Sequence, residues 1–371
     1  MPSERLVIKV GTNVLTQPNL QLDYNVIHHM VDQIGRLRAA GHLVVLVTSG
    51  AAGAARGLVD FSREKSPLVR RQMLCAVGQS RLMQIYADFF REQNIIPAQA
   101  LLARSDFASR EHYLNIRNVM EGLLQNGMLP IINENDVVAT DALTFGDNDY
   151  LAAGVASMIG ADRLFILSTA RGFFLGGDPA LNQDARLVEQ VEQITPEIRA
   201  SCEATLSSGG RGGMLSKLKA VEMAASFGIQ AHIVYGKEPD VVPRIMAGES
   251  IGTCFLPTAK RLKSYHQWLR FGPLVGGRVM VDSGARKALG NNKSLLTAGI
   301  SGVDGGFGKG EIVDIFSQDE EKLGVGLVNY SAEDLRDIIA QKNSADRPPK
   351  SAESKEVEAI HKDRMVLVNG G

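Results

Sequence analysis

Continuous apolar runs alternate with amphipathic segments over the first two thirds of the chain. The runs are typical of strands covered on both faces of a sheet, and they lie at residues 6–10, 43–47, 97–102, 129–132, 164–167 and 230–235. Apolar residues at helical spacing predict helices between them, at 26–40, 72–93, 113–126, 151–159 and 214–227. Because strands alternate with helices, we expect an α/β fold in which helices sandwich an open, mainly parallel sheet.

The pattern changes near residue 258. Residues 258–270 are polar and basic, and a glycine-rich section with short alternating strands at 277–281, 311–315 and 324–328 follows. Such short strands are typical of a small β-barrel. A polar stretch at 343–355 contains two adjacent prolines and is predicted to be a loop. We therefore predict a first domain at 1–257, a linker at 258–275, and a second domain with a polar tail at 276–371.

The composition is that of an ordinary globular protein. Of the 371 residues, 44% are hydrophobic and 22% are charged, and the formal net charge of -1 gives no general attraction to nucleic acid or anionic membranes. The three cysteines are far apart and match no metal-binding spacing, which is typical of a reducing compartment. No apolar run is long enough to span a bilayer, and the N-terminus leads directly into a predicted strand. We expect a cytoplasmic protein without a signal peptide or membrane segment.

Acids and amides cluster after the predicted strand at 129–132. They include Asn133, Asn135 and Asp136, and the cluster continues with Asn148 and Asp149 at the start of a predicted helix. Polar residues at the end of a buried strand are where an open α/β sheet usually holds its ligand. They could bind the ammonium group of an amino acid, a metal ion, or both. The alternative is a solvated loop of turns with a helix cap.

Glycine-rich turns and two lysines suggest an anion site. Gly11 and Gly50 follow the first two strands, where backbone N–H groups can approach a phosphate. Lys9 interrupts a buried strand, so we expect it to reach an anion, although an exposed sheet edge is the alternative. A glycine-rich loop at 207–217 opens a helix that carries Lys217, which is typical of a phosphate clamp or of a mobile surface loop. Two lysines around one transferring phosphoryl group is what phosphoryl transfer requires.

The motifs occur in an order and at separations that resemble a known family. They lie at residues 9–15, 47–51, 76–80, 101–104, 132–136, 145–149 and 212–217. Together they closely resemble the glutamate 5-kinases of the amino acid kinase family. The segments 281–285, 294–296, 299–300, 306–307 and 310–313 resemble the PUA domain that many bacterial members carry at the C-terminus. The resemblance covers nearly the whole chain.

The resemblance implies a role for individual residues. Lys9 and Lys217 would stabilise the transferring phosphoryl group, and Asp149 would orient these lysines. Residues implied in glutamate binding are Ser49, Gly50, Ala51, Asn133, Asn135, Asp136 and Asn148. Residues implied in nucleotide binding are Lys9, Gly11, Ser168, Thr169, Gly210, Arg211, Gly212, Gly213, Met214, Ser216 and Lys217. No protein ligand for a metal is predicted, because Mg²⁺ would travel with ATP.

The implied reaction is the ATP-dependent phosphorylation of the γ-carboxylate of L-glutamate, the first step of proline biosynthesis. A carboxylate with a reference pKa of about 4.3 is already a nucleophile at neutral pH, so no general base is required. No histidine lies in any of the motifs. The family also implies feedback inhibition by proline, a homodimer or homotetramer, and transfer of the product to glutamate-5-semialdehyde dehydrogenase.

The chain departs from the family pattern at the predicted nucleotide site. Ser168 and Thr169 stand where Thr-Asp is common, and Arg211 stands where threonine is usual. These differences leave the choice of nucleotide open. Other hypotheses are a sibling such as acetylglutamate kinase or aspartokinase, and an RNA-binding protein with a vestigial kinase fold. In the RNA-binding hypothesis, the second domain would bind RNA through a basic patch formed by Arg278, Arg286, Lys287 and Lys293.

Overall fold

The computed structural model describes residues 2–138, 148–180, 182–203, 213–258, 269, 276–343 and 358–367. The chain divides into two compact units. The first contains Met1–Asp106 and Glu111–Leu262, and the second contains Phe107–Arg110 and Lys263–Gly371. No helix within the described ranges combines the length and apolar character needed to cross a membrane. The predicted linker at 258–275 lies outside the described residues except for 258 and 269.

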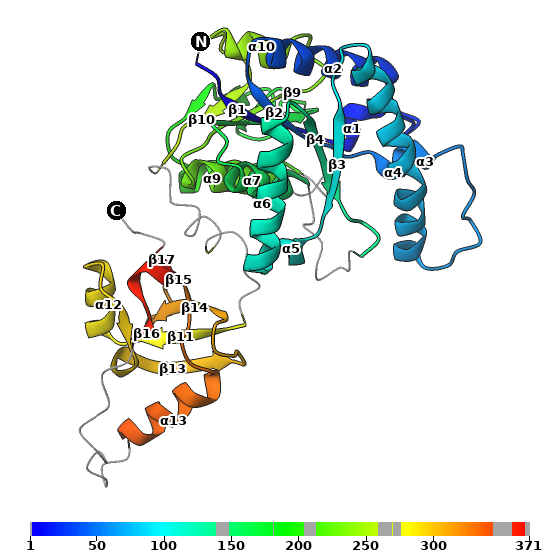
Figure 1. Ribbon diagram of the computed structural model, residues 1–371. Helices are drawn as coiled ribbons and strands as arrows, with labels where there is room; N and C mark the ends of the chain where they lie inside the picture. Colours follow the sequence, from blue (N-terminus) through cyan, green and yellow to red (C-terminus); the bar gives the residue numbers. More distant parts are fainter. Residues whose placement is uncertain are drawn as a thin grey trace. The chain divides into compact units, whose positions relative to one another are not determined.

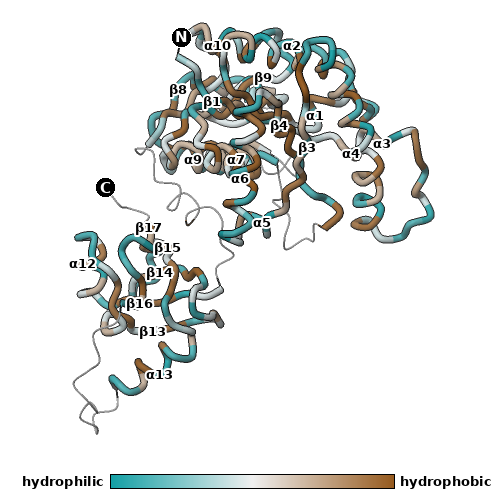
Figure 2. The backbone as a smooth tube through the Cα atoms, in the orientation of Figure 1, coloured by the Kyte–Doolittle hydropathy of each residue, from teal (hydrophilic) through white to brown (hydrophobic). Residues whose placement is uncertain are grey.

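An eight-stranded sheet forms the centre of the first unit (Figure 1). Its order is β3-β4-β2-β1-β5-β9-β10-β8, and among the described strands only the β9–β10 pairing is antiparallel. The strands are β1 (Arg5–Val10), β2 (Leu43–Val47), β3 (Pro97–Leu102), β4 (Leu129–Glu134), β5 (Arg163–Ser168), β8 (Gln190–Val191), β9 (Gln230–Tyr235) and β10 (Thr253–Phe255). The mainly parallel sheet predicted from the sequence is confirmed, and Figure 2 shows its central strands as mostly hydrophobic.

Helices cover both faces of this sheet (Figure 1). They are α1 (Thr12–Leu15), α2 (Tyr24–Ala39), α3 (Ala51–Ala55), α4 (Pro67–Arg91), α5 (Arg104–Ala108), α6 (Arg110–Gln125), α7 (Asn148–Met158), α8 (Pro196–Glu203), α9 (Met214–Ser226) and α10 (Val241–Met246). Helices α2, α4 and α10 share one apolar core with the sheet. Helices α7 and α9 pack against each other on the opposite face. A short hairpin of β6 (Phe174–Leu175) and β7 (Arg186–Leu187) lies apart from the large sheet.

Helix α4 begins earlier than its apolar pattern predicts. The predicted start was residue 72, whereas the helix begins at Pro67. The Ser66 side chain caps it by accepting a hydrogen bond from the Val69 backbone N–H (3.3 Å), and proline is favourable in the first helical turn. The extra turn of α4 carries Arg71, which contributes to the site described below.

The second unit has its own sheet and core. Five strands pair in the order β13-β11-β14-β15-β17, and β12 pairs separately with β16. The elements are β11 (Gly277–Val281), α12 (Ser283–Gly290), β12 (Leu295–Leu296), β13 (Ile300–Gly305), β14 (Ile312–Ser317), β15 (Lys322–Leu327), α13 (Ala332–Asn343), β16 (Glu358–Ile360) and β17 (Met365–Leu367). Apolar residues from both sheets and from α12 and α13 form one core. Residue 343 of the predicted polar loop ends α13, and residues 344–355 lie outside the described part.

Candidate active site

Two lysines and one aspartate form a buried charged cluster. Lys9 Nζ lies 2.5 Å from Asp149 Oδ1, and Lys217 Nζ donates a hydrogen bond to Asp149 Oδ2 at 3.0 Å. The side chains of Lys9, Asp149 and Lys217 are 4%, 0% and 11% exposed. The three residues come from β1, α7 and α9, which are far apart in the sequence. The structure therefore brings together the set that the motifs single out.

The pleat of β1 explains why Lys9 enters this cluster. Leu6, Ile8 and Val10 face the core shared with α2 and α4, so the residue between the last two faces the opposite side. Asp149 lies in the first turn of α7 and Lys217 in the first turns of α9, and both helices cover that side. Strand β1 is central in the sheet and Lys9 is buried, so the alternative of a lysine at an exposed sheet edge is wrong.

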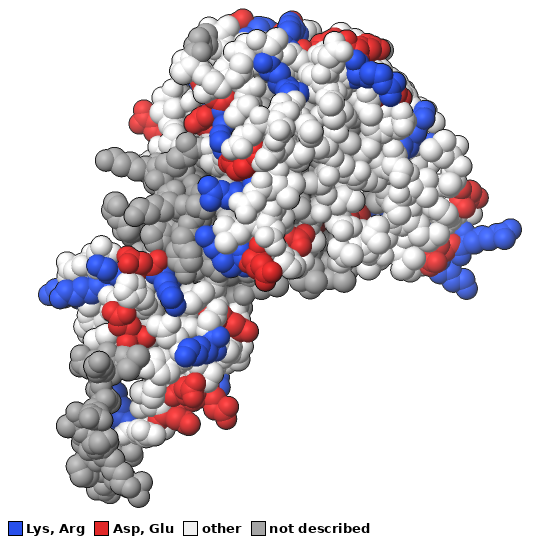
Figure 3. Space-filling view, in the orientation of Figure 1, with Lys and Arg blue, Asp and Glu red and all other residues white. Residues whose placement is uncertain are grey.

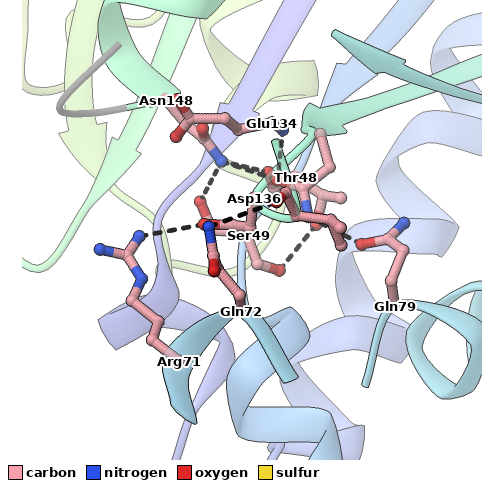
Figure 4. Close-up of polar contacts among 10 residues, drawn as sticks. Thr48, Ser49, Arg71, Gln72, Gln79, Glu134, Asp136 and Asn148 are labelled. Atoms are coloured by element: carbon pink, nitrogen blue, oxygen red, sulfur yellow. Dashed lines mark hydrogen bonds and ion pairs between the residues drawn. The ribbon is translucent and has the colours of Figure 1, made fainter. Parts of the chain in front are cut away.

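A network of amides centres on Asn148, the residue before Asp149, and Figure 4 shows its contacts with Thr48 and Ser49. The Asn148 side-chain nitrogen lies within hydrogen-bond distance of the Thr48 carbonyl oxygen (2.7 Å), Ser49 Oγ (2.9 Å) and Asn133 Oδ1 (2.9 Å), which share its two N–H donors. Asn133 in turn donates from Nδ2 to Gln79 Oε1 at 2.8 Å. Residues that follow β2 and a residue at the end of β4 thus meet the first residue of α7. The carboxyl ends of neighbouring parallel strands lie along one edge of the sheet, which explains this meeting.

Helix α4 contributes residues that the sequence analysis did not assign to the site. Arg71 forms an ion pair with Asp136 (3.1 Å), as Figure 4 shows, and Gln79 Oε1 accepts a hydrogen bond from Asn133. Gln72, Cys75 and Gln79 occupy positions i, i+3 and i+7, so they share one face of the helix. The signal in the sequence that could have identified these site residues is the presence of polar residues at buried positions of an amphipathic helix. Burial, with the Asp136 charge nearby, raises the pKa of the Cys75 thiol to about 12.

Gly78 allows α4 to approach the loop after β2. A Cβ atom at this position would lie 1.7 Å from the Ala51 carbonyl oxygen and 2.9 Å from the Ala55 backbone nitrogen. Only a residue without a side chain permits this contact between α3 and α4. Gly50 precedes α3 with φ of 95°, a left-handed conformation that also favours glycine. Both glycines therefore shape the site through the backbone.

The other predicted site residues occupy varied positions. Asn135 is half-buried in the turn after β4, and its backbone N–H donates to the Leu102 carbonyl oxygen (2.9 Å). Gly11 donates its backbone N–H to the Leu167 carbonyl oxygen at 3.4 Å, so this donor is partly engaged within the protein. Ala51 is buried in the first turn of α3. Neither the charged cluster nor the amide network described above includes Asn135, Gly11 or Ala51.

The predicted nucleotide-binding residues lie at the ends of β5 and α9. Ser168 is buried and its Oγ accepts a hydrogen bond from the Ala170 N–H (3.2 Å), whereas Thr169 is exposed. Gly213 precedes α9, and Met214 and Ser216 are half-buried in its first turn. The predicted contacts of Gly210, Arg211 and Gly212 lie outside the described residues.

In the described part of the chain, no cluster of side chains indicates histidine catalysis or metal binding. Within those ranges, no group of three or more His, Cys, Asp and Glu side chains could hold a metal ion. His232 is buried and stacks on Phe165, with ring centroids 4.9 Å apart. Burial lowers the pKa of its imidazole from 6.5 to about 4. This histidine is therefore neutral at physiological pH and lies in the core of the sheet.

The basic patch predicted on the second unit is partly neutralised. Arg278 pairs with Asp304 (2.9 Å), and Arg286 pairs with Glu321. Lys322 pairs with Asp314 at 2.7 Å. On the face shown in Figure 3, basic and acidic side chains intermingle over this unit. The geometry gives no specific support to the RNA-binding hypothesis.

The geometry of the first unit suits phosphoryl transfer to an anionic acceptor. Two buried ammonium groups can neutralise the charge of a transferring phosphoryl group. Residues 4–235 match the model of the amino acid kinase family and residues 277–347 match that of the PUA domain, so the chain belongs to the amino acid kinase family. The fold agrees with a crystal structure of UMP kinase from Bacillus anthracis, with a TM-score of 0.50, 17% identity, and coverage of 70% of this chain and 98% of that chain.

Two curated relatives match over nearly their full length. The chain is 39% identical to glutamate 5-kinase of Photobacterium profundum over 368 residues, which cover 99% of this chain and 97% of the relative. It is 41% identical to glutamate 5-kinase of Sodalis glossinidius over 366 residues, which cover 98% and 99%. The similarity includes both units, so it extends beyond the kinase fold alone.

Proposed function

We propose that this protein phosphorylates the γ-carboxylate of L-glutamate with ATP and forms γ-glutamyl phosphate, the first step of proline biosynthesis. The buried cluster of Lys9, Asp149 and Lys217 is the observation that carries the proposal. It provides two cations at one point, on a fold that belongs to a kinase family. The similarity to glutamate 5-kinases over nearly the whole chain supports glutamate as the acceptor.

Lys9 and Lys217 act on the phosphoryl group in this proposal. A γ-carboxylate oxygen of glutamate attacks the γ-phosphorus of ATP, a new P–O bond forms, and the bond to the bridging oxygen breaks to release ADP. Negative charge moves onto the leaving ADP, and the two ammonium groups offset it. Asp149 holds both lysines in place through its two oxygens. No proton transfer is needed, because the acceptor is already ionised at neutral pH.

Asn148, Asp136 and Ser49 recognise the acceptor in this proposal. The Asn148 NH₂ group is engaged with Thr48, Ser49 and Asn133, which leaves its Oδ1 oxygen as the acceptor that can face a ligand. Asp136 adds a carboxylate, now paired with Arg71. One amide oxygen and one carboxylate suit an α-ammonium group, which carries three donors. Asn133 is occupied on both sides of its amide, so it supports Asn148.

Mg²⁺ enters as part of the nucleotide substrate in this proposal. Both oxygens of Asp149 lie against lysine ammonium groups, which fits a phosphate site better than a resident metal. Ser168 ends β5 and Thr169 follows it, where the base would be bound, and these two residues make a comparison of ATP with GTP informative.

The proposal includes further expectations from the family resemblance. We propose domain boundaries at 1–257 and 276–371 with a linker between them, feedback inhibition by proline, and a homodimer or homotetramer. We also propose a cytoplasmic location and transfer of the acyl phosphate to glutamate-5-semialdehyde dehydrogenase. An acyl phosphate is labile in water, which makes its rapid use by a reducing enzyme chemically sensible.

A hydroxylamine trap tests the proposed reaction. Purified protein with glutamate, ATP and Mg²⁺ should form γ-glutamyl hydroxamate, and omission of any one substrate should abolish it. Aspartate and N-acetylglutamate serve as matched acceptors for the sibling enzymes. Hydroxamate from either of these but not from glutamate would refute the proposal and identify a sibling activity. GTP in place of ATP measures the nucleotide preference in the same assay.

A further inference from the structure

Gln79 is a buried glutamine whose amide is only half satisfied. It lies on α4 and is 9% exposed. Its Oε1 accepts a hydrogen bond from Asn133 Nδ2 at 2.8 Å, whereas its Nε2 has no hydrogen-bond partner among the residues that the structure describes. An apolar side chain would avoid this unsatisfied donor. The presence of an amide at this buried position therefore points to a role for its Oε1 oxygen.

Two backbone groups show which end of each neighbouring side-chain amide, the oxygen or the NH₂ group, faces them. The Thr48 carbonyl can only accept, so the NH₂ group of Asn148 must face it (2.7 Å). The Glu134 backbone N–H can only donate, so Asn133 Oδ1 must face it (2.9 Å). Asn133 Oδ1 then also receives the Asn148 donor, and Asn133 Nδ2 is left to find an acceptor. Gln79 Oε1 is that acceptor.

We propose that Gln79 is a positioning residue for the acceptor substrate. By accepting from Asn133, it holds Asn133 in the one orientation that receives Asn148, and Asn148 then presents its Oδ1 to the ligand. An amide oxygen and a carboxylate that act together favour a cationic donor, which in an amino acid is the α-ammonium group. The inference rests on the proposed roles of Asn148 and Asp136 in binding glutamate.

The packing of α4 supports this role. Gly78, the preceding residue, lets the helix lie against the backbone of Ala51, which brings the next side chain within reach of Asn133. Without the Gln79 oxygen, Asn133 Nδ2 would lose its hydrogen bond, and rotation of the Asn133 side chain toward another acceptor would become favourable. That rotation would withdraw Asn133 Oδ1 from Asn148 and weaken the hold on the acceptor substrate. Ser168 ends β5 and Met214 begins α9, whereas Gln79, Asn133 and Asn148 lie on α4, β4 and α7.

Three glutamine variants of α4 test the proposal. Gln79→Met removes the acceptor but keeps the length of the side chain, and we expect the KM for glutamate to rise about tenfold while the KM for ATP stays within about twofold. Gln79→Glu retains an oxygen toward Asn133 and should restore most of the glutamate KM. Gln84→Met is the matched control, because Gln84 is exposed on the same helix and, among the residues that the structure describes, donates a hydrogen bond to Asp88 (2.9 Å). Thermal unfolding establishes that each variant is folded, and Gln79→Leu replaces Gln79→Met if the latter does not fold.

A double-mutant cycle with Asn133→Ala separates positioning from simple packing. If Gln79 acts through Asn133, Gln79→Met should add no further loss to the Asn133→Ala variant. Effects on the glutamate KM that multiply in the double variant would overturn the inference, as would a Gln79→Met enzyme with the wild-type KM. Failure of the wild-type protein to form γ-glutamyl hydroxamate would instead refute the proposed function itself. The two failures are therefore distinguishable.

Discussion

Asp149→Asn should destabilise the first unit far more than the loss of one hydrogen bond would. The substitution keeps the size of the side chain but removes the charge that Lys9 and Lys217 share. Breaking a buried ion pair by removing one partner typically costs about 3–5 kcal/mol, because a buried charge loses its compensation. Here two cations lose the same carboxylate, and all three side chains are at most 11% exposed.

The deficit in the free energy of unfolding relative to wild type should be about 3–4 kcal/mol near pH 7.5, because two buried ammonium groups lose their shared counter-charge. Urea unfolding near pH 7.5 measures this deficit, and in thermal unfolding the Tm should fall by roughly 10 °C. Lys217→Met is the matched comparison, because it leaves Asp149 paired with Lys9 and should cost much less stability. Both variants should reduce turnover by about two orders of magnitude or more, because both disrupt the charges around the phosphoryl group. A deficit for Asp149→Asn that is below about 1 kcal/mol would refute the reasoning.

Three other predictions concern stability and thiol chemistry. Because the pKa of His232 is lowered, its contribution to the free energy of unfolding is fully present above about pH 6.5 and falls by about 3 kcal/mol as the pH falls to about 4. His232→Phe should abolish this decline in urea titrations at several pH values. Gly78→Ala should destabilise the protein by about 3 kcal/mol, because the added Cβ would clash with the Ala51 carbonyl oxygen. Gly122→Ala is the control: a Cβ at Gly122 would meet no atom within 4 Å, so this variant should be neutral or slightly stabilising in thermal unfolding. With its pKa raised to about 12, the Cys75 thiol should resist iodoacetamide until the protein is unfolded, and rapid native-state alkylation detected by mass spectrometry would contradict this.

Local pattern was enough to predict most of the fold of the first unit. Strands covered on both faces read as continuous apolar runs, and the predicted strands at 43–47, 97–102 and 230–235 have the bounds of β2, β3 and β9. Helix ends were less predictable, because the cap at Ser66 rather than the apolar period determines where α4 begins. In the second unit, β13 and α13 were not predicted from the sequence.

By itself, the sequence determined the chemical identity of the site. Lysines and glycine-rich turns at the ends of predicted strands and helices indicated a phosphate site, and the acids and amides indicated a site for an ammonium group, a metal ion, or both. The resemblance to glutamate 5-kinases implied the acidic acceptor. Only the tertiary structure decided how they cooperate. Lys9 becomes buried because β1 is central in the sheet, and Gln79 reaches Asn133 because Gly78 allows α4 to pack closely. The physical reason is that a strand or helix pattern determines which face a side chain occupies, whereas long-range packing determines which partner it meets there.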